Sequence, residues 1–221
     1  MSATTALFAI LAALLVGAMS PGPSFVLVSR IAVTQSRANG LAAALGMGVG
    51  GTFFAGLALL GLIALLDQVE TLYLALKLAG GVYLVWLGIR MWRGSNRPLA
   101  SSDGTVPRDR AASRALLFGL LTQLSNPKTA ILYGAIFAAL LPAAPPPWLV
   151  LTLPPLVFMV ETGWYAIVAL AFSATRPRAI YLRLKTALDR LTGLVMAGLG
   201  TRLIIEAVVV EGDTPIVMLL R

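Results

Sequence analysis

The sequence predicts an all-α integral membrane protein with six transmembrane helices, arranged as two inverted three-helix repeats. Of its 221 residues, 58% are hydrophobic and 12% are charged, whereas roughly 25% of residues are charged in a soluble domain. Such a chain has too little polar surface to cover a water-soluble globule. Its apolar residues form six runs, each long enough for a membrane span, which takes about 17–25 residues. The first run of each half is broken by proline.

The six predicted spans are separated by short polar gaps. They lie at about residues 5–33, 41–65, 72–91, 115–141, 148–172 and 188–205, and the last can extend to residue 210. A cleavable signal peptide is the alternative for the start of the chain, with residues 7–16 as its apolar core. No Lys or Arg precedes Arg30, so the basic segment that begins a signal peptide is missing.

The charged residues of the gaps predict the orientation of the bundle. Most of the 17 Lys and Arg residues lie in the first, third and fifth gaps, whereas the second gap contains Asp67 and Glu70 and the fourth has no charge. The positive-inside rule then places the odd-numbered gaps in the cytoplasm and both termini outside. We expect a first repeat at residues 1–91, a cytoplasmic linker at 92–114, a second repeat at 115–210 and a C-terminal tail at 211–221.

Composition also excludes several kinds of chemistry. The chain contains no cysteine and no histidine, which removes disulfides, thiol redox chemistry and the commonest ligands of transition metals. The net charge of +8 comes from basic residues in short gaps without interleaved aromatic residues. This pattern is typical of membrane topology and of attraction to anionic lipid headgroups, not of nucleic-acid binding. We therefore expect no cofactor, no metal, no nucleic-acid partner and no enzymatic activity.

The two proline breaks resemble each other chemically. The first is AMSPGPSF at residues 18–25, and the second is Asn126-Pro127-Lys128. In each, a favoured N-cap residue (Ser20 or Asn126) precedes a proline, which suits the first position of a helix. We therefore expect one half-helix to end and another to begin at each break. The alternative is two proline kinks that serve packing alone.

Matched breaks in the two halves of a transporter point to a substrate site between the repeats. Each half has three predicted spans, so the second half enters the membrane from the opposite side. The free N–H groups and positive dipole at the start of a half-helix suit a carboxylate. The candidate substrate-binding residues at the breaks are Ser20, Pro21, Gly22, Pro23, Ser24, Asn126, Pro127 and Lys128.

Charged residues inside the spans are further candidates. Glu161 lies near the middle of the fifth span, and burial of a carboxylate favours its neutral form, which would let it take up and release protons. We interpret it as the proton-coupling residue or as a partner for an ammonium group; the alternative is a structural pair with Lys128 or with a backbone partner. Trp164 and Tyr165 follow one turn later and either line the same cavity or fill space.

The third span and the last contain further polar residues. Lys77 can extend its ammonium to the membrane interface, so a structural role there is as well supported as a functional one. Tyr83, in the same span, is a further candidate for the site. Arg202 and Glu206 are spaced as an i,i+4 surface pair.

The glycine-rich stretch GMGVGG at residues 46–51 lies inside a continuous apolar run. It lacks the strand and helix that surround a dinucleotide-binding motif. Gly46 and Gly50 instead form a small-xxx-small pair, which predicts close packing between helices.

Several of these segments together resemble the LysE/RhtB-type amino-acid exporters, including the homoserine and threonine efflux branch. They are MSPGPSFVLV at residues 19–28, GMGVGG, KLAGGVYLVWLGIRMWR at residues 77–93, and FGLLTQLSNPKTAILYGAIF at residues 118–137. Glu161 followed by Trp164 is similar to the acidic pattern in that family's fifth span. Ser24 departs from the family, which commonly has Asn or Asp at this position.

The resemblance implies export of small amino acids or related metabolites from a prokaryotic cytoplasm, by proton antiport across the inner membrane. We expect the substrate to be a zwitterion whose carboxylate faces the half-helix N-termini and whose ammonium faces Glu161. A homodimer is a candidate assembly. The alternatives are an exporter of a different metabolite or ion on the same fold, and a membrane scaffold that transports nothing.

Overall fold

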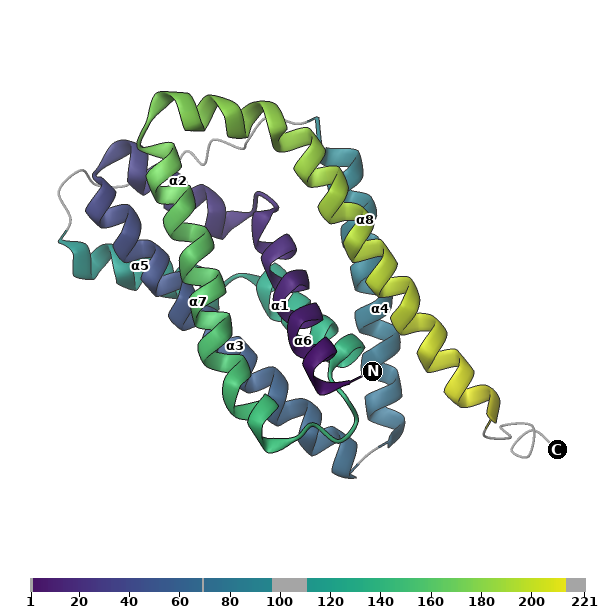
Figure 1. Cartoon of the computed structure of the whole chain (residues 1–221). Helices are drawn as coiled ribbons and strands as arrows, with labels where there is room; N and C mark the ends of the chain where they lie inside the picture. The colour runs from purple at the N-terminus through teal and green to yellow at the C-terminus, as the bar shows by residue number, and fades with distance from the viewer. Residues whose placement is uncertain (1, 69, 97–110, 214–221) are drawn as a thin grey trace.

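In residues 2–68, 70–96 and 111–213, which the computed structural model describes, the chain forms eight α-helices and no strand (Figure 1). The all-helical class is therefore confirmed for this part of the chain. The helices are α1 (Ala3–Met19), α2 (Pro23–Thr34), α3 (Arg37–Gln68), α4 (Glu70–Gly94), α5 (Ala112–Leu124), α6 (Pro127–Leu140), α7 (Pro147–Phe172) and α8 (Thr175–Asp213). Most of the predicted linker, at residues 97–110, lies outside the described residues, as does the tail from residue 214.

Four of the six predicted spans are long and apolar enough to cross a membrane. They are the segments Arg37–Leu62, Pro147–Phe172 and Ala179–Val208, together with α1 and α2 taken as one broken span. The predicted third and fourth spans correspond to α4 and to the α5–α6 pair, and of these α6 is a shorter apolar helix. Large apolar side chains such as Phe53, Leu60 and Leu151 are exposed on the described outer surface, as expected where lipid replaces water.

The first break bends the chain by 60° between α1 and α2. The prediction that Ser20 is the N-cap residue of the helix after this break is wrong. Ser20 ends α1, Gly22 is the N-cap residue of α2, and Pro23 takes the first helical position. The Pro-Gly-Pro sequence explains this, because Pro21 disfavours helical backbone at the residue before it, while Pro23 is pre-organised to start the next helix.

The second break follows the prediction. Asn126 is the N-cap residue of α6, its side chain accepts a hydrogen bond from the Lys128 backbone N–H at 3.1 Å, and Pro127 occupies the first helical position. The side-chain cap satisfies one of the donors that a helix start leaves unpaired.

Small residues let two pairs of helices pack closely. A Cβ atom on Gly46 of α3 would overlap the Leu116 carbonyl of α5, and one on Gly50 would lie 2.7 Å from the Gln123 Cβ. This confirms the close packing predicted for the GMGVGG stretch. Gly88 of α4 meets the Gly193 carbonyl of α8 in the same way, and Figure 1 shows these two helices side by side along much of their length.

The last helix begins earlier than predicted. The basic gap before the expected span at residues 188–205 is part of α8, which starts at Thr175. Arg and Lys are good helix formers, and the buried pair of Lys185 and Asp189, 2.7 Å apart at i,i+4, neutralises charge on the inward face. The chain can therefore continue as a helix through a segment whose composition is that of a gap.

Candidate functional site

The two helix breaks face each other across a small cavity of about 20 Å³. Seven of the predicted site residues line it: Ser20, Gly22, Ser24, Asn126, Lys128, Glu161 and Tyr165. Pro21, Pro23, Pro127 and Trp164 are not among the lining residues; the prolines shape the breaks instead. The cavity has room for a water-sized group but not for an amino acid.

A chain of buried hydrogen bonds connects the first break to the second. The Asn126 Nδ2 donates to the Ser24 Oγ at 3.0 Å, and that hydroxyl donates to the Gln123 Oε1 at 2.6 Å. All three side chains are buried. Because Ser24 lies on α2, Gln123 on α5 and Asn126 at the start of α6, these hydrogen bonds connect α2 to the α5–α6 pair.

The same series of hydrogen bonds continues to Glu161, the carboxylate predicted near the middle of the fifth span. Glu161 is 3% exposed, and its Oε2 accepts from the Gln123 Nε2 at 3.2 Å while its Oε1 accepts from the Tyr133 hydroxyl at 2.9 Å. The alternative of a direct ion pair with Lys128 is not among the contacts that the structure shows. The space is tight, because a Cβ atom on Gly51 would lie 2.9 Å from both the Glu161 Cγ and the Tyr133 hydroxyl oxygen.

Gln123 and Tyr133 were missed at the sequence level. Gln123 carried a usable signal, because an amide in an apolar span seeks a partner on another helix and it lies three residues before the second break. Tyr133 carried none that separates it from the aromatic residues that fill a core. Thr129, which also lines the cavity, was missed for the same reason, since Thr is common in such spans.

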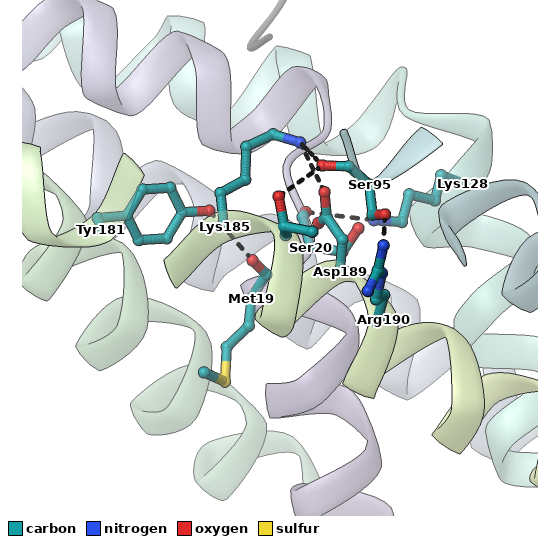
Figure 2. A network of polar contacts seen from close by, with 9 residues as sticks. Met19, Ser20, Ser95, Lys128, Tyr181, Lys185, Asp189 and Arg190 are labelled. Carbon is teal, nitrogen blue, oxygen red and sulfur yellow. Dashed lines mark hydrogen bonds and ion pairs between the residues drawn. The ribbon is translucent and has the colours of Figure 1, made fainter. Parts of the chain in front are cut away.

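The carbonyl end of α1 is satisfied by side chains from three other helices. In a continuous helix the Gly17 and Met19 carbonyls would accept from N–H groups at positions 21 and 23, but both positions are proline, which has no N–H. Side-chain donors serve this end of the helix instead: Thr192 to Val16, Lys128 to Gly17 and Ser20, Trp164 to Ala18, and Tyr181 to Met19. Figure 2 shows Lys128 and Tyr181 approaching this end of α1.

The two half-helix N-termini differ in their capping. Asn126 caps α6 with its own side chain, whereas α2 begins at Gly22 with no side-chain cap. A Cβ atom on Gly22 would lie 3.6 Å from the Lys128 Nζ, so an ammonium group lies beside the uncapped end. The start of α2 is therefore the better position for an anion.

A second polar cluster lies between α4 and α8, next to the end of α1. The Lys185 Nζ donates to the Ser95 carbonyl at 3.2 Å and to the Asp189 Oδ2 at 2.7 Å, and Arg190 donates to the Ser95 Oγ at 3.4 Å (Figure 2). Lys185 and Asp189 are both buried. This cluster fixes the end of α4 to α8.

Lys77 and Tyr83 lie outside the cavity. The Lys77 Nζ is 3.5 Å from the Glu206 Oε2 on α8, and Glu206 also forms the predicted i,i+4 pair with Arg202 at 2.7 Å. The Tyr83 ring packs against Trp86, with ring centroids 5.6 Å apart. Among the described residues, no group of three or more Asp or Glu side chains could hold a metal ion.

Broken spans around a buried carboxylate are features of the class of secondary membrane transporters. A family model described as LysE type translocator matches residues 15–207, and the chain belongs to this family. It is thus a membrane transporter, not an enzyme, and the resemblance seen in its motifs is confirmed.

Relatives cover most of the chain. The threonine efflux protein of Escherichia coli (strain K12) is 36% identical over 197 residues, which is 87% of this chain and 94% of that protein. The threonine efflux protein of Salmonella typhimurium is 35% identical over 196 residues with the same coverage. An uncharacterised membrane protein of Escherichia coli, YahN, is 29% identical over 191 residues, 86% of this chain and 84% of its own length. No solved structure matches.

Proposed function

We propose that this protein is a secondary transporter that exports small amino acids from the cytoplasm by proton antiport. The observation that carries the proposal is the hydrogen-bonded chain from Asn126 through Ser24 and Gln123 to the buried Glu161. It joins both helix breaks to one carboxylate. The threonine efflux proteins among the relatives make L-threonine the first substrate to test.

The cavity offers partners for both charges of a zwitterion. The uncapped start of α2 and the nearby Lys128 suit a carboxylate, whereas Glu161 and the carbonyl end of α1 suit an ammonium. A neutral amino acid would therefore leave no charge unpaired in the site, which is the requirement for binding at membrane depth.

The arrangement we propose has six spans in two inverted repeats. The first repeat contains α1–α2, α3 and α4, and the second contains α5–α6, α7 and α8. The basic odd-numbered gaps support a cytoplasmic position for those gaps and an outer position for both termini in a prokaryotic inner membrane.

Coupling would act through the hydrogen bonds of Glu161. As a carboxylate it only accepts hydrogen bonds, here from Gln123 and Tyr133. A protonated carboxyl must also donate, and the Tyr133 hydroxyl accepts that hydrogen bond only by giving up the one it now donates to Glu161. Protonation from outside would thus disturb these hydrogen bonds, and it would release the substrate there.

The experiment uses the protein reconstituted into proteoliposomes loaded with L-threonine, with export driven by an imposed pH gradient. Glu161→Gln keeps the shape of the side chain but removes its titratable carboxyl group. We expect this variant to insert and fold while gradient-driven export is abolished. The matched control is Glu206→Gln, because Glu206 forms ion pairs away from the cavity.

Unchanged pH-dependent export by Glu161→Gln would refute proton coupling at this residue. Efflux of other metabolites without any efflux of amino acids would refute the substrate class and support the alternative of a different exporter on the same fold.

A further inference from the structure

The end of α1 has the properties of a binding site for an ammonium group. Its last carbonyls lie at the break between α1 and α2 and form the negative end of the helix dipole. Pro21 and Pro23 remove the N–H groups that would pair two of them. Unwound carbonyls at the ends of half-helices coordinate cations in transporters that have broken spans.

Lys128 occupies this position in the structure. Its Nζ donates to the Gly17 carbonyl at 3.4 Å and to the Ser20 carbonyl at 3.3 Å. Both distances are long compared with the 2.7–2.9 Å of strong charge-assisted hydrogen bonds. The other described donors at this end, from Thr192, Trp164 and Tyr181, are neutral and come from α7 and α8.

A buried carboxylate with an unused hydrogen-bond acceptor lies near the same position. Asp189 is 5% exposed, its Oδ2 pairs with Lys185, and its Oδ1 is buried without a hydrogen-bond partner among the described residues. Figure 2 draws Asp189 together with Ser20 and Lys128 in one network of polar side chains. The end of α1 thus lies near a carboxylate whose charge Lys185 neutralises but whose second oxygen still has the capacity to accept a hydrogen bond.

The cavity borders these acceptors. Gly17, Ala18 and Ser20 line it on the side of α1, and Gly22 and Ser24 line it at the uncapped start of α2. The α-ammonium of an amino acid has the same three donors as the lysine side chain. Both groups can therefore compete for the Gly17 and Ser20 carbonyls.

We propose that, in the absence of substrate, the Lys128 ammonium occupies the position that the ammonium of the substrate takes on binding. On binding, the substrate ammonium takes the Gly17 and Ser20 carbonyls, and the displaced Lys128 pairs with the substrate carboxylate at the start of α2. One ammonium is exchanged for another, so the charge at the end of α1 does not change. Glu161 is then left to carry the proton. This inference rests on the proposed function and places both charged groups of its substrate.

The test measures binding to the purified full-length protein by titration calorimetry. The probes are L-threonine, 1-amino-2-propanol, which lacks the carboxylate, and 3-hydroxybutyrate, which lacks the ammonium. We expect the wild-type protein to bind 1-amino-2-propanol at least about tenfold more weakly than threonine, the loss expected for one charge-assisted interaction. Because 1-amino-2-propanol has no carboxylate, the Lys128 ammonium that it displaces from the Gly17 and Ser20 carbonyls would have no new anionic partner.

Variants of Lys128 separate its two roles. Lys128→Met frees the carbonyls, so its affinity for 1-amino-2-propanol should rise about tenfold or more over wild type, while its affinity for 3-hydroxybutyrate falls. Lys128→Gln keeps an amide donor for the carbonyls and should show a smaller change in the same direction. Lys128→Arg is the control, because it keeps a cation at the end of α1 and should gain no amine affinity.

If the neutral variants are too unstable for calorimetry, ethylammonium chloride should raise their unfolding temperature relative to potassium chloride and leave the wild-type protein unaffected. Absence of any amine-dependent gain in both assays overturns the inference, even where the wild-type protein still transports threonine. Failure of the wild-type protein to bind or transport any amino acid overturns the proposed function, and with it this inference.

Discussion

Ser24 connects the two helix breaks through side-chain hydrogen bonds. It accepts a hydrogen bond from Asn126 and donates one to Gln123, and all three side chains are buried in an apolar bundle. Removal of its hydroxyl would leave a buried acceptor and a buried donor without partners, and each such loss costs about 1–3 kcal/mol.

Ser24→Ala should therefore lower the unfolding temperature and reduce threonine export. Ser29→Ala is the matched control, since Ser29 lies on the same helix, is also buried, and donates within its own helix to the Val26 carbonyl at 3.1 Å. Thermal unfolding in detergent and transport in proteoliposomes measure the two effects. Equal behaviour of the two variants would show that the link between the breaks carries no special role.

At this scale the sequence predicted the charged and break-forming residues of the site but not their partners. Glu161, Lys128 and Asn126 could be found because a charge or a cap before proline is rare inside an apolar run. Tyr133 could not be found, because its function depends on which oxygen lies opposite its hydroxyl. Trp164 was expected to line the cavity or fill space, yet its indole donates to the Ala18 carbonyl at 3.0 Å, a contact that depends on where α1 ends.

At the scale of helices, the contact between α3 and α5 depends on glycine. A Cβ atom on Gly46 would overlap the backbone of α5 at Leu116 and Leu120. Backbone cannot move aside as a flexible side chain can, so the helices would have to separate. Overpacking of this kind costs about 1–3 kcal/mol.

Gly46→Ala should thus destabilise the protein in thermal unfolding. Gly56 lies on the same helix, and a Cβ atom added there would have nothing within 4 Å. Gly56→Ala should therefore stabilise the protein by about 0.5–1 kcal/mol through the better helix propensity of alanine. Stabilisation by both substitutions would show that α3 and α5 do not depend on close approach.

The helix boundaries show where the sequence predicts the structure correctly and where it does not. The second break was predicted correctly because Asn126 and Pro127 are adjacent signals for one helix start. The first was shifted, because Ser20 and Gly22 both precede a proline, and the Pro-Gly-Pro sequence starts α2 at Pro23 instead of at Pro21. The start of α8 was missed because a basic gap and a basic helical segment have the same composition. The pairing of Lys185 with Asp189, which composition does not show, distinguishes the two.

For the whole molecule, the order of apolar runs and gaps predicted the class, and the absence of cysteine makes the topology easy to test. Ala112 and Ala143 are both exposed, in the third gap and in the fourth. If the third gap is cytoplasmic, the thiol introduced by Ala143→Cys should react with a membrane-impermeant maleimide in intact cells. The thiol introduced by Ala112→Cys should react only after permeabilisation. The reverse labelling pattern would invert the proposed orientation.

The carbonyl end of α1 has a consequence for how the protein is made. The ribosome delivers the first half to the membrane before α6, α7 and α8 exist, yet these helices supply the donors for the last carbonyls of α1. Until they arrive, the newly inserted N-terminal half carries polar backbone that lipid cannot satisfy. The two halves are therefore interdependent in biogenesis: an N-terminal fragment produced alone should be cleared by membrane proteases, and co-production of the C-terminal fragment should protect it.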